Sequence, residues 1–89
     1  MDYQWDEHKA RSNLQKHGID FVDAVSVFED EMAITIEDDY PEGERFVTIG
    51  MNAVGQILVV VYTYRGNIIR LISARRATSY ECRHYEGRP

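Results

Sequence analysis

The sequence predicts an α+β fold, in which an antiparallel β-meander of about four strands is flanked by two N-terminal helices and one C-terminal helix. Three observations lead to this prediction. Apolar residues recur at helical spacing over residues 6–28, strand periodicity dominates residues 32–76, and helix-capping residues follow that segment. Because the expected strands succeed one another with short turns between them, they should pair as antiparallel neighbours.

A short extra strand at residues 3–5 is expected to precede the first helix. Asp6 is a suitable N-cap for that helix, and Gly18 is a suitable left-handed stop after a helix that ends at about residue 17. At helical spacing, one face of the helix carries a polar stripe of Asp6, Lys9, Asn13 and His17. Ala10 and Leu14 lie beside this stripe and are expected to face the core.

A second helix is expected directly afterwards, over residues 21–28. Asp20 is its N-cap, supported by Asp23 in the first turn. Its apolar face consists of Phe21, Ala24, Val25 and Phe28. The linker between the two helices is short, which predicts a tight helical pair.

The expected strands of the meander cover residues 32–36, 45–51, 56–64 and 67–76. The third strand is apolar on both faces over residues 57–61, so we expect it in the centre of the sheet. The acidic, proline-containing segment 37–43 is expected to be a loop, and Arg65-Gly66-Asn67 predicts a hairpin turn. A final helix over residues 80–86, capped by Thr78 or Ser79, completes the prediction.

Length and composition exclude several classes of protein. The 89 residues suffice for a single domain, and no apolar run approaches the roughly 20 residues that a membrane span needs. The N-terminus lacks the pattern of a signal peptide, and the single cysteine, Cys82, permits neither an internal disulfide nor a cysteine-based zinc site. We therefore expect one cytoplasmic domain over residues 1–89, with no membrane association.

The charges are segregated along the chain, although the net charge is −5. Residues 20–44 contain ten Asp or Glu and no Lys or Arg, whereas residues 45–89 contain seven Arg and two Glu. A basic half with an acidic counterweight can present a phosphate-binding face. The two halves can equally neutralise each other on folding, and the charge counts do not separate these alternatives.

The residues that could support chemistry are basic and aromatic. No nucleotide-binding or zinc-protease motif occurs, and the three histidines lack metal-ligand spacing, so neither a metal nor a cofactor is expected. The candidates are Lys9, His17, Arg45, Arg65, Arg70, Arg75, Arg76, Tyr62, Tyr64 and Tyr85. Such a set suits a phosphodiester, because arginine binds phosphate bidentately and tyrosine stacks on bases.

Two of these arginines belong to one expected strand. Strict alternation places Arg70 and Arg75 on opposite faces of it. Either a bulge or the strand end redirects Arg75, or only one of the two is catalytic and the other is structural. Arg70, in the middle of the strand, is the favoured catalytic residue.

Four sequence blocks occur in a specific order. They are W-D-E-H-K-A-x-x-N-x-x-K-H-G-I-x-F-x-x-A over residues 5–24, E-R at 44–45, R-x-I-S-A-R-R-A at 70–77 and E-x-x-x-Y at 81–85. Together they resemble the BrnT family, the toxins of a bacterial type II toxin–antitoxin pair. The resemblance covers nearly the whole chain and implies a RelE-like fold and a metal-independent ribonuclease that inhibits translation. It also implies a cognate ribbon-helix-helix antitoxin, in a heterotetramer that contacts operator DNA only through the antitoxin.

The resemblance further implies roles for individual residues. It assigns catalysis to Lys9, Arg45, Arg70 and Arg75, with His17 as a further candidate. A 2′-hydroxyl of the RNA would attack the adjacent phosphate, Arg45 and Arg70 would hold that phosphate, and Lys9 or His17 would assist proton transfer. RNA binding is expected from Arg65, Arg76 and Tyr64.

Structural roles remain open for the same residues. Lys9 is consistent with a solvated helix residue, His17 with a charge at a helix C-terminus, and Arg45 with a cross-strand ion pair. For the whole protein, the main alternative is a catalytically inactive module that binds the antitoxin and contributes to operon repression. A third possibility is direct nucleic-acid binding through the hairpin of residues 65–76.

Overall fold

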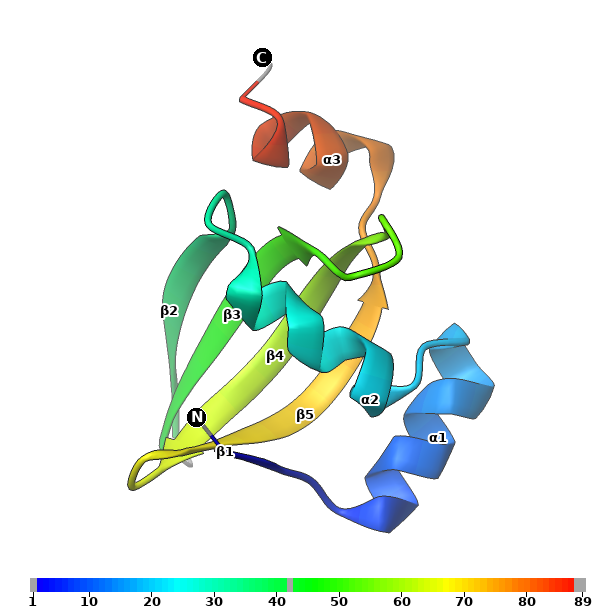
Figure 1. The fold of residues 1–89 in the computed structure, drawn as a ribbon. Coiled ribbons are helices and arrows are strands. Elements are labelled where there is room, and N and C mark those ends of the chain that lie inside the picture. The colour runs from blue at the N-terminus through cyan, green and yellow to red at the C-terminus, as the bar shows by residue number, and fades with distance from the viewer. Residues whose placement is uncertain (1, 42, 88–89) are drawn as a thin grey trace.

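The computed structural model describes residues 2–41 and 43–87, except for the side chains of residues 39 and 40. In these residues a five-stranded sheet carries helices on one face, at one edge and at one end (Figure 1). The strands are β1 (Asp2–Gln4), β2 (Ile34–Tyr40), β3 (Gly43–Met51), β4 (Ile57–Arg65) and β5 (Ile68–Arg76). The helices are α1 (Glu7–His17), α2 (Phe21–Ala24), the 3-10 helix η1 (Val25–Glu29) and α3 (Ser79–Tyr85).

The predicted helices are confirmed, together with their caps. The Asp6 side chain accepts hydrogen bonds from the backbone N–H groups of His8 and Lys9, and Gly18 ends α1 in the left-handed conformation. The second helical segment begins after Asp20 as expected, but it changes from α2 to η1 at its midpoint. Thr78 caps α3 through a capping box.

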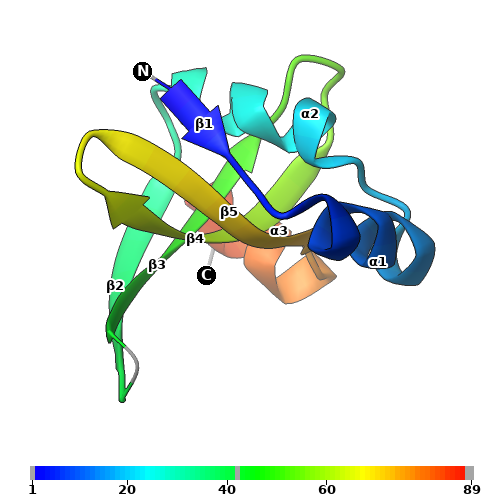
Figure 2. The ribbon, with the colours of Figure 1, turned by 90° about the horizontal axis from the view of Figure 1, so that it is seen from below.

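The sheet differs from the predicted antiparallel meander because β1 is a fifth strand and pairs with β5 in parallel. Tyr3 lies opposite Ile69, and the strand order is β1-β5-β4-β3-β2. The other three pairings are antiparallel, so the sheet is mixed. Figure 2 shows β1 beside β5 at the edge of the sheet, leading directly into α1. Parallel neighbours need a long connection, and here the helices α1, α2 and η1 and the strands β2 to β4 lie between β1 and β5 along the chain.

The prediction of a loop over the acidic residues 37–43 is also wrong, because most of this segment is strand. β2 continues to Tyr40, and β3 already begins at Gly43. In the register of this hairpin, Ile36 lies opposite Val47 and Glu37 lies opposite Phe46. Backbone pairing along the hairpin therefore overrides the low strand propensity of Asp and Glu.

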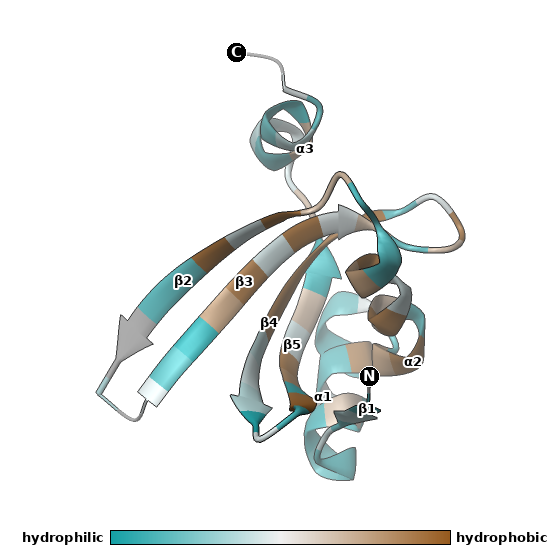
Figure 3. Cartoon of the chain, turned by 60° about the vertical axis from the view of Figure 1, so that its left-hand side comes forward, coloured by the Kyte–Doolittle hydropathy of each residue, from teal (hydrophilic) through white to brown (hydrophobic). Residues whose placement is uncertain are grey.

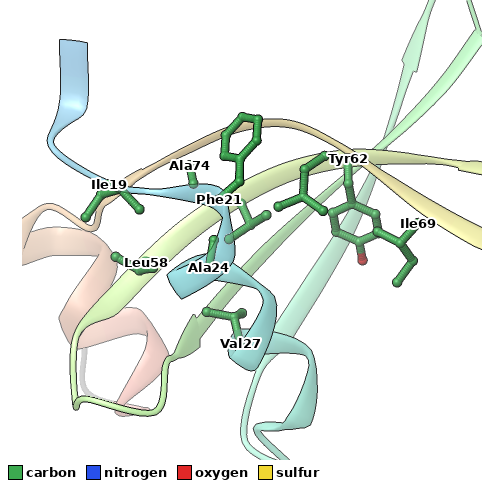
Figure 4. Close-up of a cluster of buried hydrophobic side chains, with 10 residues drawn as sticks. Ile19, Phe21, Ala24, Val27, Leu58, Tyr62, Ile69 and Ala74 are labelled. Carbon is green, nitrogen blue, oxygen red and sulfur yellow. The ribbon is translucent and has the colours of Figure 1, made fainter. Parts of the chain in front are cut away.

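The core lies between one face of the sheet and the segment formed by α2 and η1 (Figures 1 and 4). Its buried members are Ile19, Phe21, Ala24, Val27, Leu58, Val60, Tyr62, Ile69, Leu71 and Ala74. We call this side of the sheet the helical face, and the other side the opposite face. Figure 3 shows apolar residues along β4 and in α2, and mostly polar residues on α1. Val59 and Val60 point to different faces of β4 and both are buried, which confirms the central position of this strand.

Asn13 holds α1 against the edge of β5. Its Nδ2 donates hydrogen bonds to the carbonyl oxygens of Ala74 and Ile19, at 2.8 and 3.0 Å, and its Oδ1 accepts one from the backbone N–H of Ala74 at 3.1 Å. Because β1 pairs with β5 only at residues 68–70, the Asn13 amide takes the place of a neighbouring strand at Ala74. Asn13, in the middle of the polar stripe of α1, therefore faces the protein, whereas Asp6 and Lys9 of the same stripe are exposed.

This contact makes the predicted orientation of α1 wrong in part. Asn13 is only 6% exposed, whereas Leu14, which was expected in the core, is 46% exposed. Ala10 does pack against the core, as predicted. A helix face can be buried without being apolar when its polar group satisfies an otherwise unpaired backbone edge.

We expect Asn13→Leu to lower the free energy of unfolding by roughly 2–4 kcal/mol, because the buried N–H and C=O of Ala74 would lose their partners. Urea denaturation followed by circular dichroism measures this loss. Leu14→Ala on the same helix is the control and should cost less than about 1 kcal/mol. Equal losses in the two variants would show that Asn13 does not anchor α1.

Candidate functional site

A bulge in β5 determines which way its arginines point. Val61 lies opposite Ser73, but Tyr62 lies opposite Leu71, so Ile72 is an extra residue in β5. Without it, Arg70 and Arg75 would point to opposite faces. The extra residue brings both onto the opposite face, so the bulge is the alternative that the structure supports.

Four cations from four different elements surround a cleft of about 190 Å³ on the opposite face. These are Lys9 from α1, Arg45 from β3, Arg65 from β4 and Arg70 from β5. Thr63 and Ile72 also line this cleft, which we call the arginine cleft. Glu44 is the one acidic residue among its described lining residues, so the cleft favours an anionic ligand.

Arg70 is positioned by the first strand. The parallel register places Gln4 opposite Arg70, and Nη1 of Arg70 donates a hydrogen bond to Oε1 of Gln4 at 2.8 Å. An amide orients a guanidinium without cancelling its charge. Arg70 therefore keeps its positive charge available for an anion in the arginine cleft.

Arg45 has a different environment, because Asp38 of β2 lies opposite it in the antiparallel register. An acidic residue thus stands beside one of the four cations. The cross-strand alternative for Arg45 is compatible with this register. For the other three cations, Lys9, Arg65 and Arg70, the described lining of the cleft includes one acidic residue, Glu44.

Arg75 makes an ion pair with α3. Its Nη1 and Nη2 donate to the two carboxylate oxygens of Glu81, each at 2.8 Å. The same carboxylate accepts a hydrogen bond from the backbone N–H of Thr78, as part of the capping box of α3. The contact with Arg75 lowers the pKa of Glu81 from its ordinary value of 4.5 to about 2. Arg75 therefore anchors α3 and does not line the arginine cleft.

The other end of α3 is held by Tyr85. Its hydroxyl donates to the Asp30 carboxylate, which also accepts hydrogen bonds from the backbone N–H groups of Met32 and Met51. The bond to Asp30 raises the pKa of Tyr85 to about 12. Both ends of the E-x-x-x-Y block thus attach α3 to the sheet and to the turn before β2.

The remaining predicted site residues lie elsewhere. His17 lines a second cleft at the C-terminal half of α1, and Arg76 lies exposed at the end of β5. Tyr64 points to the helical face, where its ring lies 5.1 Å from Phe46 and 5.9 Å from Tyr62. Tyr62 is a core residue whose hydroxyl is hydrogen-bonded to Thr48. The structure therefore brings four of the eight predicted site residues together.

Four neighbours of the site were not predicted from the sequence: Gln4, Gly43, Thr63 and Ile72. Thr63 lies opposite Arg70 in the β4–β5 register, and Gln4 lies opposite it on the other side. The position of Thr63 follows from counting back across the predicted hairpin. Gln4 has no such signal, because its pairing is with a strand more than sixty residues away.

The described residues show neither a candidate metal-binding cluster nor a helix that could span a membrane. No group of three or more His, Cys, Asp or Glu side chains in residues 2–41 and 43–87 is arranged to hold a metal ion. None of the helices in this part of the chain has the length and apolarity needed to cross a membrane.

The fold and the cleft define a small α+β protein with a mixed sheet and a cationic cleft suited to a polyanion. A family model described as "Ribonuclease toxin, BrnT, of type II toxin-antitoxin system" matches residues 5–81. The chain belongs to this BrnT family of ribonuclease toxins, which confirms the resemblance seen in the sequence blocks.

Solved structures support the same assignment. The chain is similar to the ribonuclease toxin BrnT of Brucella abortus, known from a crystal structure at 1.1 Å resolution. The two share 28% sequence identity with a TM-score of 0.71, over 89% of this chain and 99% of the Brucella chain. This likeness confirms the α+β class. The comparison with curated proteins found no match.

The Arg75–Glu81 ion pair is expected to make stability depend on pH. Because the pKa of Glu81 is lowered on folding, the pair stabilises the protein fully above about pH 4.5, and this contribution is lost as the pH falls towards 2. Arg75 and Glu81 are 39% and 22% exposed, so solvent screening limits the effect to about 1 kcal/mol.

Urea denaturation of wild type and Glu81→Gln between pH 2 and pH 7 measures this contribution. The difference in unfolding free energy between the two should shrink to near zero at the acid end, since protonation already breaks the pair in the wild type. Glu86→Gln, at the C-terminal end of α3 and outside the capping box, is the control. Parallel curves for wild type and Glu81→Gln would refute a stabilising ion pair.

Proposed function

We propose that this protein is an endoribonuclease toxin that cleaves RNA in the arginine cleft without a metal ion, and so inhibits translation. The observation that carries the proposal is the convergence of Lys9, Arg45, Arg65 and Arg70 on one cleft. Membership of the BrnT family supports it, because that family is described as ribonuclease toxins. RNA supplies the polyanion that such a cleft favours.

In the proposed reaction, the 2′-hydroxyl of one nucleotide attacks the adjacent phosphorus. A new bond from the 2′-oxygen to phosphorus forms, the bond to the 5′-oxygen breaks, and the products are a 2′,3′-cyclic phosphate and a 5′-hydroxyl. Arg70, oriented by Gln4, and Arg45 bind the non-bridging oxygens and neutralise the charge that develops on them.

Two protons move in this reaction. The proton of the 2′-hydroxyl passes to water, and the ammonium group of Lys9 donates one to the leaving 5′-oxygen. Lys9 is the better placed of the two predicted proton-transfer groups, because it lines the arginine cleft and His17 does not. Arg65 contributes RNA binding at the rim formed by the β4–β5 hairpin.

We further propose that the toxin acts in the cytoplasm and that a ribbon-helix-helix antitoxin neutralises it in a heterotetramer. Operator DNA would contact that complex only through the antitoxin. A type II toxin–antitoxin family implies an antitoxin partner, which supports this part of the proposal.

Arg70→Ala should abolish toxicity. Inducible expression in bacteria that lack the antitoxin should arrest growth with cleaved RNA for the wild type. For the variant, the rate of RNA cleavage should fall roughly 100-fold, since one preorganised donor to the transition state is removed. Arg83→Ala, in exposed α3 and outside the cleft, is the matched control and should behave as wild type. Undiminished toxicity of Arg70→Ala would refute the proposed site.

One observation favours the alternative of an inactive antitoxin-binding module that contributes to operon repression. Among the described residues that line the arginine cleft there is no histidine, and the one carboxylate is Glu44. Glu44 is therefore the one conventional general base in the described lining, and no histidine is available for this role. Soluble, folded wild-type protein that leaves RNA intact and bacterial growth unchanged would support this alternative.

A further inference from the structure

A second cleft of about 200 Å³ lies between α1 and β5. Lys9 and Ile72 line both this cleft and the arginine cleft, so the two are contiguous. Beyond that boundary, the second cleft is lined by Ser12, Lys16 and His17 of α1 and by Ser73 of β5. Lys9 therefore lies where the two clefts meet.

The lining of the second cleft suits an anion. It offers two ammonium groups, an imidazole and two hydroxyls, and its described lining includes no acidic residue. Neither Lys9 nor Lys16 forms an ion pair with a carboxylate in the described part of the chain. Charge-assisted donors of this kind, together with hydroxyls, are the groups that bind phosphate oxygens in nucleic-acid complexes.

The walls of this cleft are fixed by contacts already described. The three hydrogen bonds of Asn13 set the distance between α1 and β5, and they use both polar atoms of its side chain. The bulge at Ile72 brings Ser73 opposite Val61. Asn13 is thus a positioning residue, while Lys16 and Ser73 remain available to a ligand.

We propose that the second cleft is a subsite for a backbone phosphate that flanks the scissile phosphate of the RNA. The inference rests on the proposed function of the arginine cleft and extends it to a substrate of at least two consecutive phosphates. Lys9 lies between the two phosphates. Lys16, with the hydroxyls of Ser12 and Ser73, binds the flanking one.

A purely structural role is the competing explanation for Lys16 and His17. Both lie in the last turn of α1, where positive charge offsets the negative end of the helix dipole. In that case Lys16→Gln would change stability and leave RNA binding unchanged. The two explanations therefore predict different results in a binding experiment.

Binding is measured with a fluorescein-labelled 12-nucleotide RNA carrying 2′-O-methyl groups, which the protein cannot cleave because no 2′-hydroxyl is available. Anisotropy titrations of the full chain over a series of KCl concentrations give Kd and its salt slope. We expect Lys16→Gln to raise Kd roughly three- to tenfold and to reduce the slope by about 0.7, the value for one phosphate contact on a single strand. Ser73→Ala should raise Kd with the slope unchanged.

The matched control is Arg11→Gln, on the same helix but lining a different surface with Trp5 and Val22. It removes the same charge and should leave Kd and slope nearly as in the wild type. The proposal is overturned if Lys16→Gln binds like the wild type, or if Arg11→Gln weakens binding as much as Lys16→Gln does.

Cleavage assays separate a failure of the subsite from a failure of the proposed function. If the protein cleaves RNA, Lys16→Gln should lower kcat/KM for a cleavable 12-nucleotide RNA and leave that for a dinucleotide, which has one bridging phosphate, unchanged. Equal effects on the two substrates would overturn the subsite while the ribonuclease activity stands. No cleavage of either substrate by the wild type would overturn the proposed function itself.

Discussion

The hydrogen bonds between Asn13 and the backbone of Ala74 are the constraint on which the arrangement of both clefts depends. β1 is too short to cover the whole edge of β5, and the Asn13 amide completes the pairing where β1 has ended. The cost of an unpaired buried backbone group is high enough to determine which face of a helix turns inward. Because Asn13 turns inward, Lys9 and His17, which lie on the same stripe, line clefts against β5.

Two arginines of the bulged strand β5 have different roles, one in the arginine cleft and one in an ion pair with α3. Arg70 points into the arginine cleft with Gln4 beside it, and Arg75 binds Glu81 and so holds α3. Both side chains lie on the opposite face because Ile72 is an extra residue in the strand. One short segment thereby supplies a candidate ligand-binding cation and an anchor for the last helix. The same sequence block that resembles the BrnT signature therefore combines a proposed functional role with a structural one.

The charged residues that are segregated along the chain form both acid–base contacts and a cationic cleft in the structure. Arg75 is neutralised within its own half of the chain by Glu81, and Asp38 of the acidic half lies opposite Arg45. Lys9, Arg65 and Arg70 gather around one cleft whose described lining contains a single acidic residue. The charge counts left neutralisation between the two halves and a cationic surface as alternatives, and Arg45 takes part in both, because it lies opposite Asp38 and also lines the arginine cleft. Membership of the BrnT family of ribonuclease toxins supports the proposal that this surface binds RNA.

The sequence by itself determined the features whose causes are local. The caps at Asp6, Asp20 and Thr78, the stop at Gly18 and the doubly buried β4 follow from side chains within a few residues, and the family follows from blocks of consecutive residues. Tertiary structure alone decided the parallel pairing of β1, the burial of Asn13 and the bulge at Ile72. Each of these depends on a hydrogen-bonding partner distant in sequence, and no local propensity encodes such a partner. The sequence therefore predicted the arginines that line the cleft as site residues, but the register of the sheet determines that they meet in one cleft.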